Sequence, residues 1–156
     1  MSAQEGKTGI ITLSDDDPDT VERMLSYLYC SDYESGEDSS SGFNNARVYA
    51  IAEKYDIPLL KELAKERFVK WAEDNWSHRD FPAVAREVYE STLSSDRGLR
   101  DVVSRLYVEH GKDLVGTAGF VNLGDLIGEL GLDVLAKVLR NMDEMEAANV
   151  GLTRAL

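Results

Sequence analysis

Residues 46–68 read ARVYAIAEKYDIPLLKELAKERF, and this stretch decides the fold that the sequence predicts. Pro58 keeps the preceding residue, Ile57, out of the α region, so that one helix ends there and a second helix begins. On the second helix, apolar side chains recur at helical spacing: Leu60, Leu63, Ala64, Phe68 and Trp71. A connection of two or three residues makes packed neighbours of the two helices. We therefore expect a helical hairpin with its corner at Pro58.

The residues before this hairpin predict one strand and one helix. Residues 9–13, GIITL, are few and rich in β-branched side chains, which is typical of a strand. Asp16 or Asp17 can cap a helix that begins at Pro18 and ends near Cys30. An apolar stripe on this helix is expected to face the core: Val21, Met24, Leu25, Leu28 and Tyr29.

Residues 31–42, SDYESGEDSSSG, show no apolar periodicity and are predicted to form a mobile loop. Ser35 is followed by Glu37 and Asp38, which makes it a candidate site for an acid-directed kinase. A phosphate there would add charge to a segment that is already negative. A plain solvated linker is the simpler interpretation of the same residues.

The remainder of the chain is predicted to be helical. Glycines at 111, 116, 119 and 131 are expected to separate the last helices, and the tail from Glu144 is expected to fray. The predicted helices cover residues 81–91, 97–114, 121–130 and 132–142. The fold class that follows is mainly α, a helical bundle with one short β-strand.

Composition and charge exclude several functions. The chain has 156 residues and a net charge of −12, and residues 1–45 hold 10 of its 29 acidic side chains but 2 of its 17 basic ones. Without a cluster of Lys and Arg, no nucleic-acid binding is expected. The most apolar stretch, residues 120–139, is interrupted by four charged side chains, so no membrane span is expected. The single cysteine, Cys30, favours a reducing compartment, and we expect a cytoplasmic or nuclear protein.

No residues in the sequence have the spacing of a catalytic or metal site. His78 and His110 each stand alone, without an HExxH motif or a second cysteine for zinc. His110 lies on the apolar stripe of its helix and is expected to be a core or boundary residue. Cys30 is interpreted as a small apolar residue, because no histidine or basic residue is near it in the sequence. We expect no enzyme activity, no metal and no cofactor.

Two stretches together resemble a known family. Residues 6–33, GKTGIITLSDDDPDTVERMLSYLYCSDY, and residues 44–68, NNARVYAIAEKYDIPLLKELAKERF, resemble the second half of a BTB/POZ domain of the fungal type. The resemblance covers residues 3–75, and the helices that follow are similar to the extension of such proteins. It implies the C-terminal part of a BTB/POZ-like domain at residues 1–75 and a helical extension at residues 76–156.

The sequence departs from this family at its N-terminus. A complete BTB/POZ domain begins with a strand-helix-strand segment that includes the dimerisation helix, whereas residues 1–8 alone precede the predicted strand here. We therefore expect a truncated domain that self-associates through the surface left exposed. The GIITL strand is expected to pair with its counterpart in a second copy or to lie disordered, because an unpaired buried strand leaves its backbone groups unsatisfied.

The resemblance implies a non-enzymatic protein-interaction module that self-associates or recruits partner proteins. An alternative is a Skp1-like or BTB substrate adaptor of a cullin-type ubiquitin ligase. Cullin-binding BTB proteins use a hydrophobic-x-Glu motif before the strand, where this chain has Ala3-Gln4-Glu5 with its smaller alanine. An enzyme assembled from scattered residues is a third hypothesis, and it requires a cleft with convergent titratable groups. Partner contacts are expected at six residues: Glu5, Asp19, Arg23, Tyr27, Tyr55 and Asp56.

Overall fold

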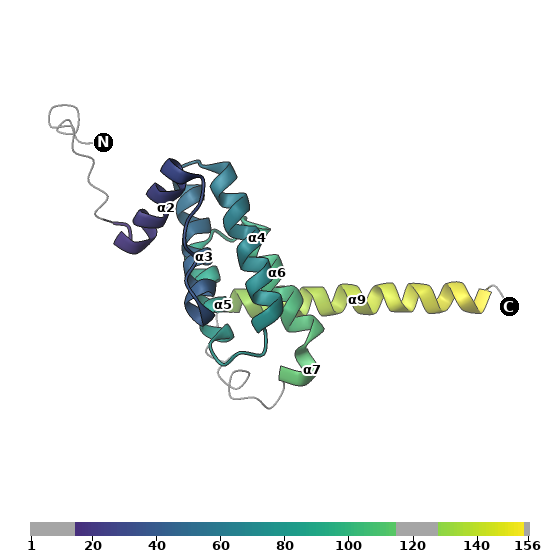
Figure 1. Cartoon of the computed structure of the whole chain (residues 1–156). Coiled ribbons are helices and arrows are strands. Elements are labelled where there is room, and N and C mark those ends of the chain that lie inside the picture. The colour runs from purple at the N-terminus through teal and green to yellow at the C-terminus, as the bar shows by residue number, and fades with distance from the viewer. Residues whose placement is uncertain (1–14, 115–127, 155–156) are drawn as a thin grey trace.

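The computed structural model describes residues 15–114 and 128–154, and these residues form seven helices (Figure 1). The predicted mainly helical class is confirmed, while the strand predicted at residues 9–13 lies outside the described residues. Within the two described ranges, none of the helices combines the length and the apolar composition that a membrane span needs. The helices are α2 Pro18–Cys30, α3 Asp38–Lys54, α4 Pro58–Asn75, α5 Phe81–Ser91, α6 Arg97–Glu109, α7 Gly111–Leu114 and α9 Gly128–Arg154.

Local interactions set both ends of α2, and its bounds agree with the prediction. Of the two candidate caps, Asp17 is the one used: its carboxylate accepts hydrogen bonds from the Thr20 backbone N–H at 2.9 Å and from the Thr20 hydroxyl at 2.7 Å. Pro18 lies in the first turn, where its missing N–H costs no hydrogen bond. At the other end, Ser31 adopts a left-handed conformation and donates its N–H to the Tyr27 carbonyl.

α3 begins at Asp38, so the prediction of a loop is wrong for residues 38–42. No side chain caps the first turn of α3. Instead, Trp71 of α4 covers it: the indole N–H donates to the Asp38 carbonyl at 2.8 Å, and the ring lies directly over Gly42. Ser and Gly are weak helix formers. The tertiary contact with Trp71 therefore favours the helix where local propensity does not.

The predicted hairpin between α3 and α4 is confirmed, with residues 55–57 as its connection. Asp56 adopts a left-handed conformation with φ 54°, and the Ile57 N–H donates to the Ala52 carbonyl at 2.8 Å. α3 and α4 form the most extensive helix pair in the described chain, and α3 also packs against α2 and α5. α3 is therefore the helix around which the bundle is arranged.

Aromatic side chains from α4, α5 and α6 form the centre of the core. The rings of Phe68 and Trp71 are 6.1 Å apart, those of Trp71 and Phe81 are also 6.1 Å apart, and Phe81 meets Tyr107 at 5.5 Å. α5 packs on α3 and α6 packs on α4, so helices from both sides of the predicted boundary at residue 75 share one core. The division into two units itself stays a prediction.

The C-terminal helices differ from the prediction in their bounds, whereas α5 agrees with it. α6 ends at Glu109 rather than near Leu114, and α7 is a separate short helix. α9 is continuous through Gly131 and extends to Arg154, so the predicted break and the predicted end at residue 142 are wrong. The fraying predicted from Glu144 stays a prediction. Most of the helix predicted at residues 121–130 lies outside the described residues. A glycine inside a helix costs only about 1 kcal/mol relative to alanine, which the packing of α9 on α6 can offset. Figure 1 shows α9 extending far beyond the bundle.

Two glycines in helices allow a direct test of the contact between α3 and α4. A Cβ added to Gly42 would lie 2.6 Å from the Trp71 ring, whereas a Cβ on Gly131 meets nothing within 4 Å. Gly42→Ala is expected to destabilise the protein by about 1–3 kcal/mol through overpacking. Gly131→Ala should stabilise it by up to about 1 kcal/mol through helix propensity. Urea denaturation of both variants measures these free energies of unfolding, and equal effects of the two substitutions would contradict the packing assigned to Gly42.

Candidate interaction surface

The outer side of α2 carries three large apolar side chains that remain open to solvent. Leu25, Leu28 and Tyr29 are 42%, 55% and 88% exposed. Their spacing of three and four residues makes them neighbours on the helix surface. The sequence predicts them to face the core, and for these three residues that prediction is wrong. We call the three residues the α2 outer face.

The apolar stripe of α2 is wider than the contact that α2 makes with its neighbours. Thr20 and Met24 are buried, and Val21 and Tyr27 pack partly buried against the core. α2 packs mainly on α3, and a single neighbouring helix covers only part of its circumference. The periodicity in the sequence thus identifies the apolar positions but not how many of them a neighbour covers. Tyr27, a predicted contact residue, is directed toward the core by this packing.

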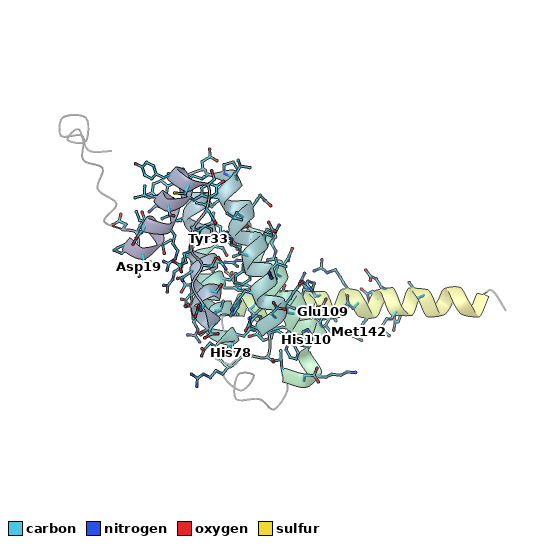
Figure 2. The ribbon with its side chains drawn as sticks, in the orientation of Figure 1. Asp19, Tyr33, His78, Glu109, His110 and Met142 are labelled. Carbon is cyan, nitrogen blue, oxygen red and sulfur yellow. The ribbon has the colours of Figure 1, made fainter. Side chains whose placement is uncertain are left out.

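Asp19 and Arg23, two further predicted contact residues, lie one turn apart on the polar side of α2. The Arg23 guanidinium donates to the Asp19 carbonyl at 2.9 Å and to the Glu34 carbonyl at 3.1 Å, which joins α2 to the segment that follows it. Figure 2 labels Asp19 near the start of α2. Both residues line a cavity of about 360 Å³ with Glu22, Ser26, Glu34 and Gly36. Its charged side chains are mostly acidic, which favours a basic group from a partner.

Tyr55 and Asp56 lie at the corner between α3 and α4, close to the start of α2. The Tyr55 hydroxyl donates to Asp16 at 2.7 Å, and the Lys54 ammonium group pairs with the same carboxylate at 2.8 Å. Lys54 and then Tyr55 lower the pKa of the Asp16 carboxyl below its ordinary value. Asp56 is exposed. The Tyr55 hydroxyl thus connects the corner to Asp16, just before α2. Asp56 is the residue at the corner that remains exposed to solvent.

Ser35 lies in a segment that is held by hydrogen bonds. Its hydroxyl donates to the buried Asn45 side chain at 2.9 Å, and the Tyr33 hydroxyl donates to the same oxygen at 2.7 Å. Phosphorylation of Ser35 would break its bond to Asn45, and the kinase site stays a prediction. Glu5, the remaining predicted contact residue, lies outside the described residues.

The histidines and the cysteine occupy unrelated places. His110 is the C-cap of α6 at the boundary of the core, as expected, and stacks on Trp76 with ring centroids 3.7 Å apart. His78 lies beside Asp80 at the surface. Cys30 is exposed at the end of α2. In the part of the chain that the structure describes, no three His, Cys, Asp or Glu side chains are placed to hold a metal ion.

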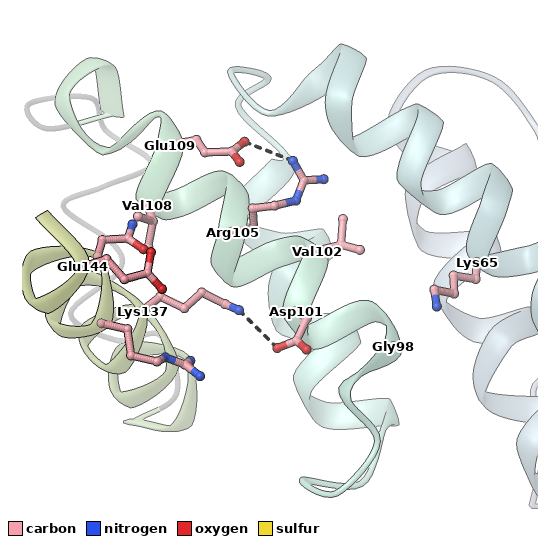
Figure 3. A pocket seen from close by; sticks show the side chains of 11 residues that line it. Lys65, Gly98, Asp101, Val102, Arg105, Val108, Glu109, Lys137 and Glu144 are labelled. Atoms are coloured by element: carbon pink, nitrogen blue, oxygen red, sulfur yellow. Dashed lines mark hydrogen bonds and ion pairs between the residues drawn. The ribbon is translucent and has the colours of Figure 1, made fainter. Parts of the chain in front are cut away.

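A groove between α6 and α9, with Lys65 of α4 on its far side, is a feature that the sequence analysis missed (Figure 3). Its volume is about 690 Å³. Within it, Lys137 pairs with Asp101 at 3.3 Å and Arg105 pairs with Glu109 at 3.0 Å. The charged groups of the groove thus neutralise one another, which is typical of ion pairs that stabilise a surface. The groove combines residues from three helices that are far apart in the sequence, so no local motif could reveal it.

A partly buried polar cluster connects α3, α4 and the start of α6. The Asp96 carboxylate accepts hydrogen bonds from the Tyr49 hydroxyl at 2.7 Å, the Lys61 ammonium group at 2.8 Å and the Gly98 N–H at 3.1 Å. Burial alone would raise the pKa of the Asp96 carboxyl, but Lys61, Tyr49 and Gly98 together lower it below the ordinary value. A Cβ on Gly98 would lie 2.1 Å from the Tyr49 hydroxyl. The close approach of Tyr49 to the start of α6 therefore requires a glycine at position 98.

The lowered pKa of Asp96 predicts how stability depends on pH. Because the folded-state pKa lies below the unfolded-state pKa, the cluster stabilises the protein above about pH 4, and this stabilisation is lost as pH falls through the folded-state pKa. Asp96→Asn should cost about 1–3 kcal/mol of unfolding free energy at pH 7 and progressively less in acid. Urea denaturation at a series of pH values measures this difference.

The matched control for Asp96 is Glu109→Gln, which removes an exposed ion pair with Arg105. This substitution should change the free energy of unfolding by less than about 1 kcal/mol. If both variants lose the same small amount at pH 7, the cluster around Asp96 does not hold the helices together.

Comparisons with known proteins do not extend these observations. No protein-family model matches the chain, and neither a curated protein nor a solved structure matches it. The BTB/POZ resemblance therefore stays a prediction from the sequence, and the α2 outer face is the surface from which a function can be argued.

Proposed function

We propose that the protein is a non-enzymatic protein-interaction module, similar to part of a BTB/POZ domain, that binds other proteins or itself through the α2 outer face. The observation that carries this proposal is the exposure of Leu25, Leu28 and Tyr29 on one side of a well-formed helix. Exposed apolar side chains that lie together are typical of interaction sites. Burying one leucine side chain contributes about 1.5–3 kcal/mol, so a partner that covers the three residues gains a substantial part of its affinity there.

The helix that carries this face is held in place before any partner binds. Asp17 caps its first turn, Arg23 joins it to the following segment, and the Lys54–Asp16 ion pair fastens its start to the end of α3. A surface that is already ordered loses little conformational entropy on binding. Tyrosine is also among the residues that contribute most to binding at interfaces, which favours Tyr29 as the central contact.

Charge around the α2 outer face favours one class of partner. Asp19 and Glu22 are exposed on the same helix, and Asp15 and Asp17 are exposed at its start. Complementary charges at the rim of an interface promote association and specificity. The partner expected here is a protein surface with an apolar centre and basic residues around it.

Substitutions on the α2 outer face test this proposal. Leu28→Asp and Tyr29→Ala should each weaken partner binding at least tenfold, or about 1.4 kcal/mol, because they remove apolar contact area. The control is Leu93→Asp, since Leu93 is 70% exposed in the connection between α5 and α6. The measurement is affinity capture with the full chain and its three variants, quantified protein by protein, after circular dichroism has shown that each variant is folded.

The pattern of capture distinguishes the candidate partners. Proteins that bind the wild type and Leu93→Asp but not the two α2 variants support the proposal. A cullin among them, in a one-to-one complex with this chain, would identify the adaptor alternative. Equal capture by all four proteins would show that the α2 outer face is not the binding surface.

A further inference from the structure

The connection between α2 and α3 is held by side chains of the helices around it. The carbonyls of residues 32–35 each accept a hydrogen bond from a side chain, and the donors are Arg23 and Ser26 of α2, Asn44 of α3 and Arg67 of α4. Figure 2 labels Tyr33, the residue whose carbonyl Arg67 contacts. The Arg67 guanidinium also lies over the Tyr33 ring, 4.5 Å from its centroid. Arg67 is therefore positioned beside the segment that contains Ser35.

The Ser35 hydroxyl is one of two hydroxyls that donate to the same buried oxygen. The Asn45 side chain accepts from Tyr33 at 2.7 Å and from Ser35 at 2.9 Å. Tyr33 is buried and Ser35 is partly exposed. If the Ser35 hydroxyl leaves, the Asn45 oxygen keeps its bond from Tyr33, so no buried group loses its last partner. A rotation about the Cα–Cβ bond of Ser35 is therefore enough to free its Oγ.

Ser35 lines a cavity between the start of α3 and α4. The volume of this cavity is about 310 Å³, which is larger than a phosphate group. Two basic side chains of α4, Arg67 and Lys70, line it together with one acidic side chain, Asp74. Cations therefore outnumber acids beside the Ser35 hydroxyl, although the whole chain has a net charge of −12.

Both of these cations keep N–H groups that can bind an anion. Lys70 is exposed, and in the described part of the chain no carboxylate pairs with it. Arg67 uses two of its five N–H groups, one on the Tyr33 carbonyl and one on the Asp32 carboxylate. The Asp32 side chain is 66% exposed, so its ion pair with Arg67 is a weak surface pair and leaves the guanidinium open to a second anion.

The residues after Ser35 favour recognition by an acid-directed kinase. Glu37 and Asp38 follow it at the second and third positions, and both are exposed. Acids at these positions attract a kinase whose substrate groove is basic. Ser35 lies before α3, whereas the three serines at 39–41 lie within that helix. A kinase can therefore bind Ser35 with less unwinding of α3 than these serines require.

We propose that Ser35 is a phosphorylation site whose phosphate is received by Arg67 and Lys70 of α4. The kinase transfers the γ-phosphoryl group of ATP: a bond forms between the Ser35 Oγ and phosphorus, the bond from phosphorus to the bridging oxygen breaks, ADP leaves, and the hydroxyl proton passes to the base of the kinase. The phosphate carries a charge of about −1.5 to −2 and three acceptor oxygens. Charge-assisted bonds to the two cations thus replace one bond to Asn45.

The receiving cations are tested by the pKa of the phosphate, measured by ³¹P NMR on the full chain with phosphoserine incorporated at position 35. The second pKa of phosphoserine is ordinarily about 6. Contact with Arg67 and Lys70 lowers this pKa, whereas the nearby acids raise it: Asp32, Glu34, Glu37, Asp38 and Asp74. In the folded protein the pKa should be roughly half a unit or more below its value in concentrated urea.

Variants of α4 identify the cations responsible. Lys70→Gln and Arg67→Gln should each return the phosphate pKa toward its value in urea. The matched control is Lys65→Gln, because Lys65 lies on the same helix but lines the groove against α6 and α9. Lys70 is exposed, so this variant should keep the fold even if Arg67→Gln does not, which circular dichroism checks. A folded-state pKa at or above the value in urea, or an equal response to all three substitutions, would overturn the role given to Arg67 and Lys70.

A kinase reaction tests whether the folded chain is modified at Ser35. The full chain is incubated with casein kinase 2 and ATP, and the phosphate is located by mass spectrometry. Ser35→Ala should reduce incorporation at least tenfold, and Asp38→Asn should slow it several-fold. Glu109→Gln, which removes an exposed acid of α6, is the control and should react as the wild type does. No incorporation, or incorporation only at other serines, would overturn Ser35 as the site. The proposed function of the α2 outer face does not depend on this result.

Discussion

The fold depends on the burial of α3, because three other helices pack directly against it. α2, α4 and α5 all contact α3, and its buried positions lie on several sides of the helix. A helix enclosed in this way needs small residues where its neighbours approach most closely. Gly42, beneath Trp71, and Ala46 and Ala52, both fully or almost fully buried, serve this purpose. The close packing of these positions holds the hairpin and α5 as one unit.

Buried and partly buried polar groups then determine how the later helices join this unit. Asp96 receives hydrogen bonds from α3 and α4 and thereby defines where α6 begins. Arg100, one turn later, joins the end of α5 to the start of α9. A buried charge without partners would be costly, so these side chains allow few alternative arrangements. The direction of α9, and with it the exposure of its apolar stripe, follows from interactions inside the bundle.

The two exposed apolar surfaces of the bundle share one physical origin. On both α2 and α9, the apolar stripe in the sequence is wider or longer than the neighbour available to cover it. Met24 and Leu130 are buried by the bundle, whereas Tyr29 and Leu139 on the same helices remain exposed. Apolar side chains that the chain itself leaves exposed are available for contacts with other molecules. Figure 1 shows α2 and the free end of α9 on opposite sides of the bundle.

The sequence by itself determined the helical class, the hairpin at Pro58 and the bounds of α2 and α5, because proline, capping side chains and 3.6-residue periodicity act locally. It also placed Asp19 and Arg23 in the helix that begins at Pro18. Only the tertiary structure decided that residues 38–42 are helical, that α9 continues through Gly131 and that Leu28 faces solvent. In each of these cases the outcome depends on contacts with distant residues, such as Trp71 on Gly42 or Arg100 beside α9. Local propensities differ by about 1 kcal/mol or less for most residues, and a single packed aromatic ring can outweigh them.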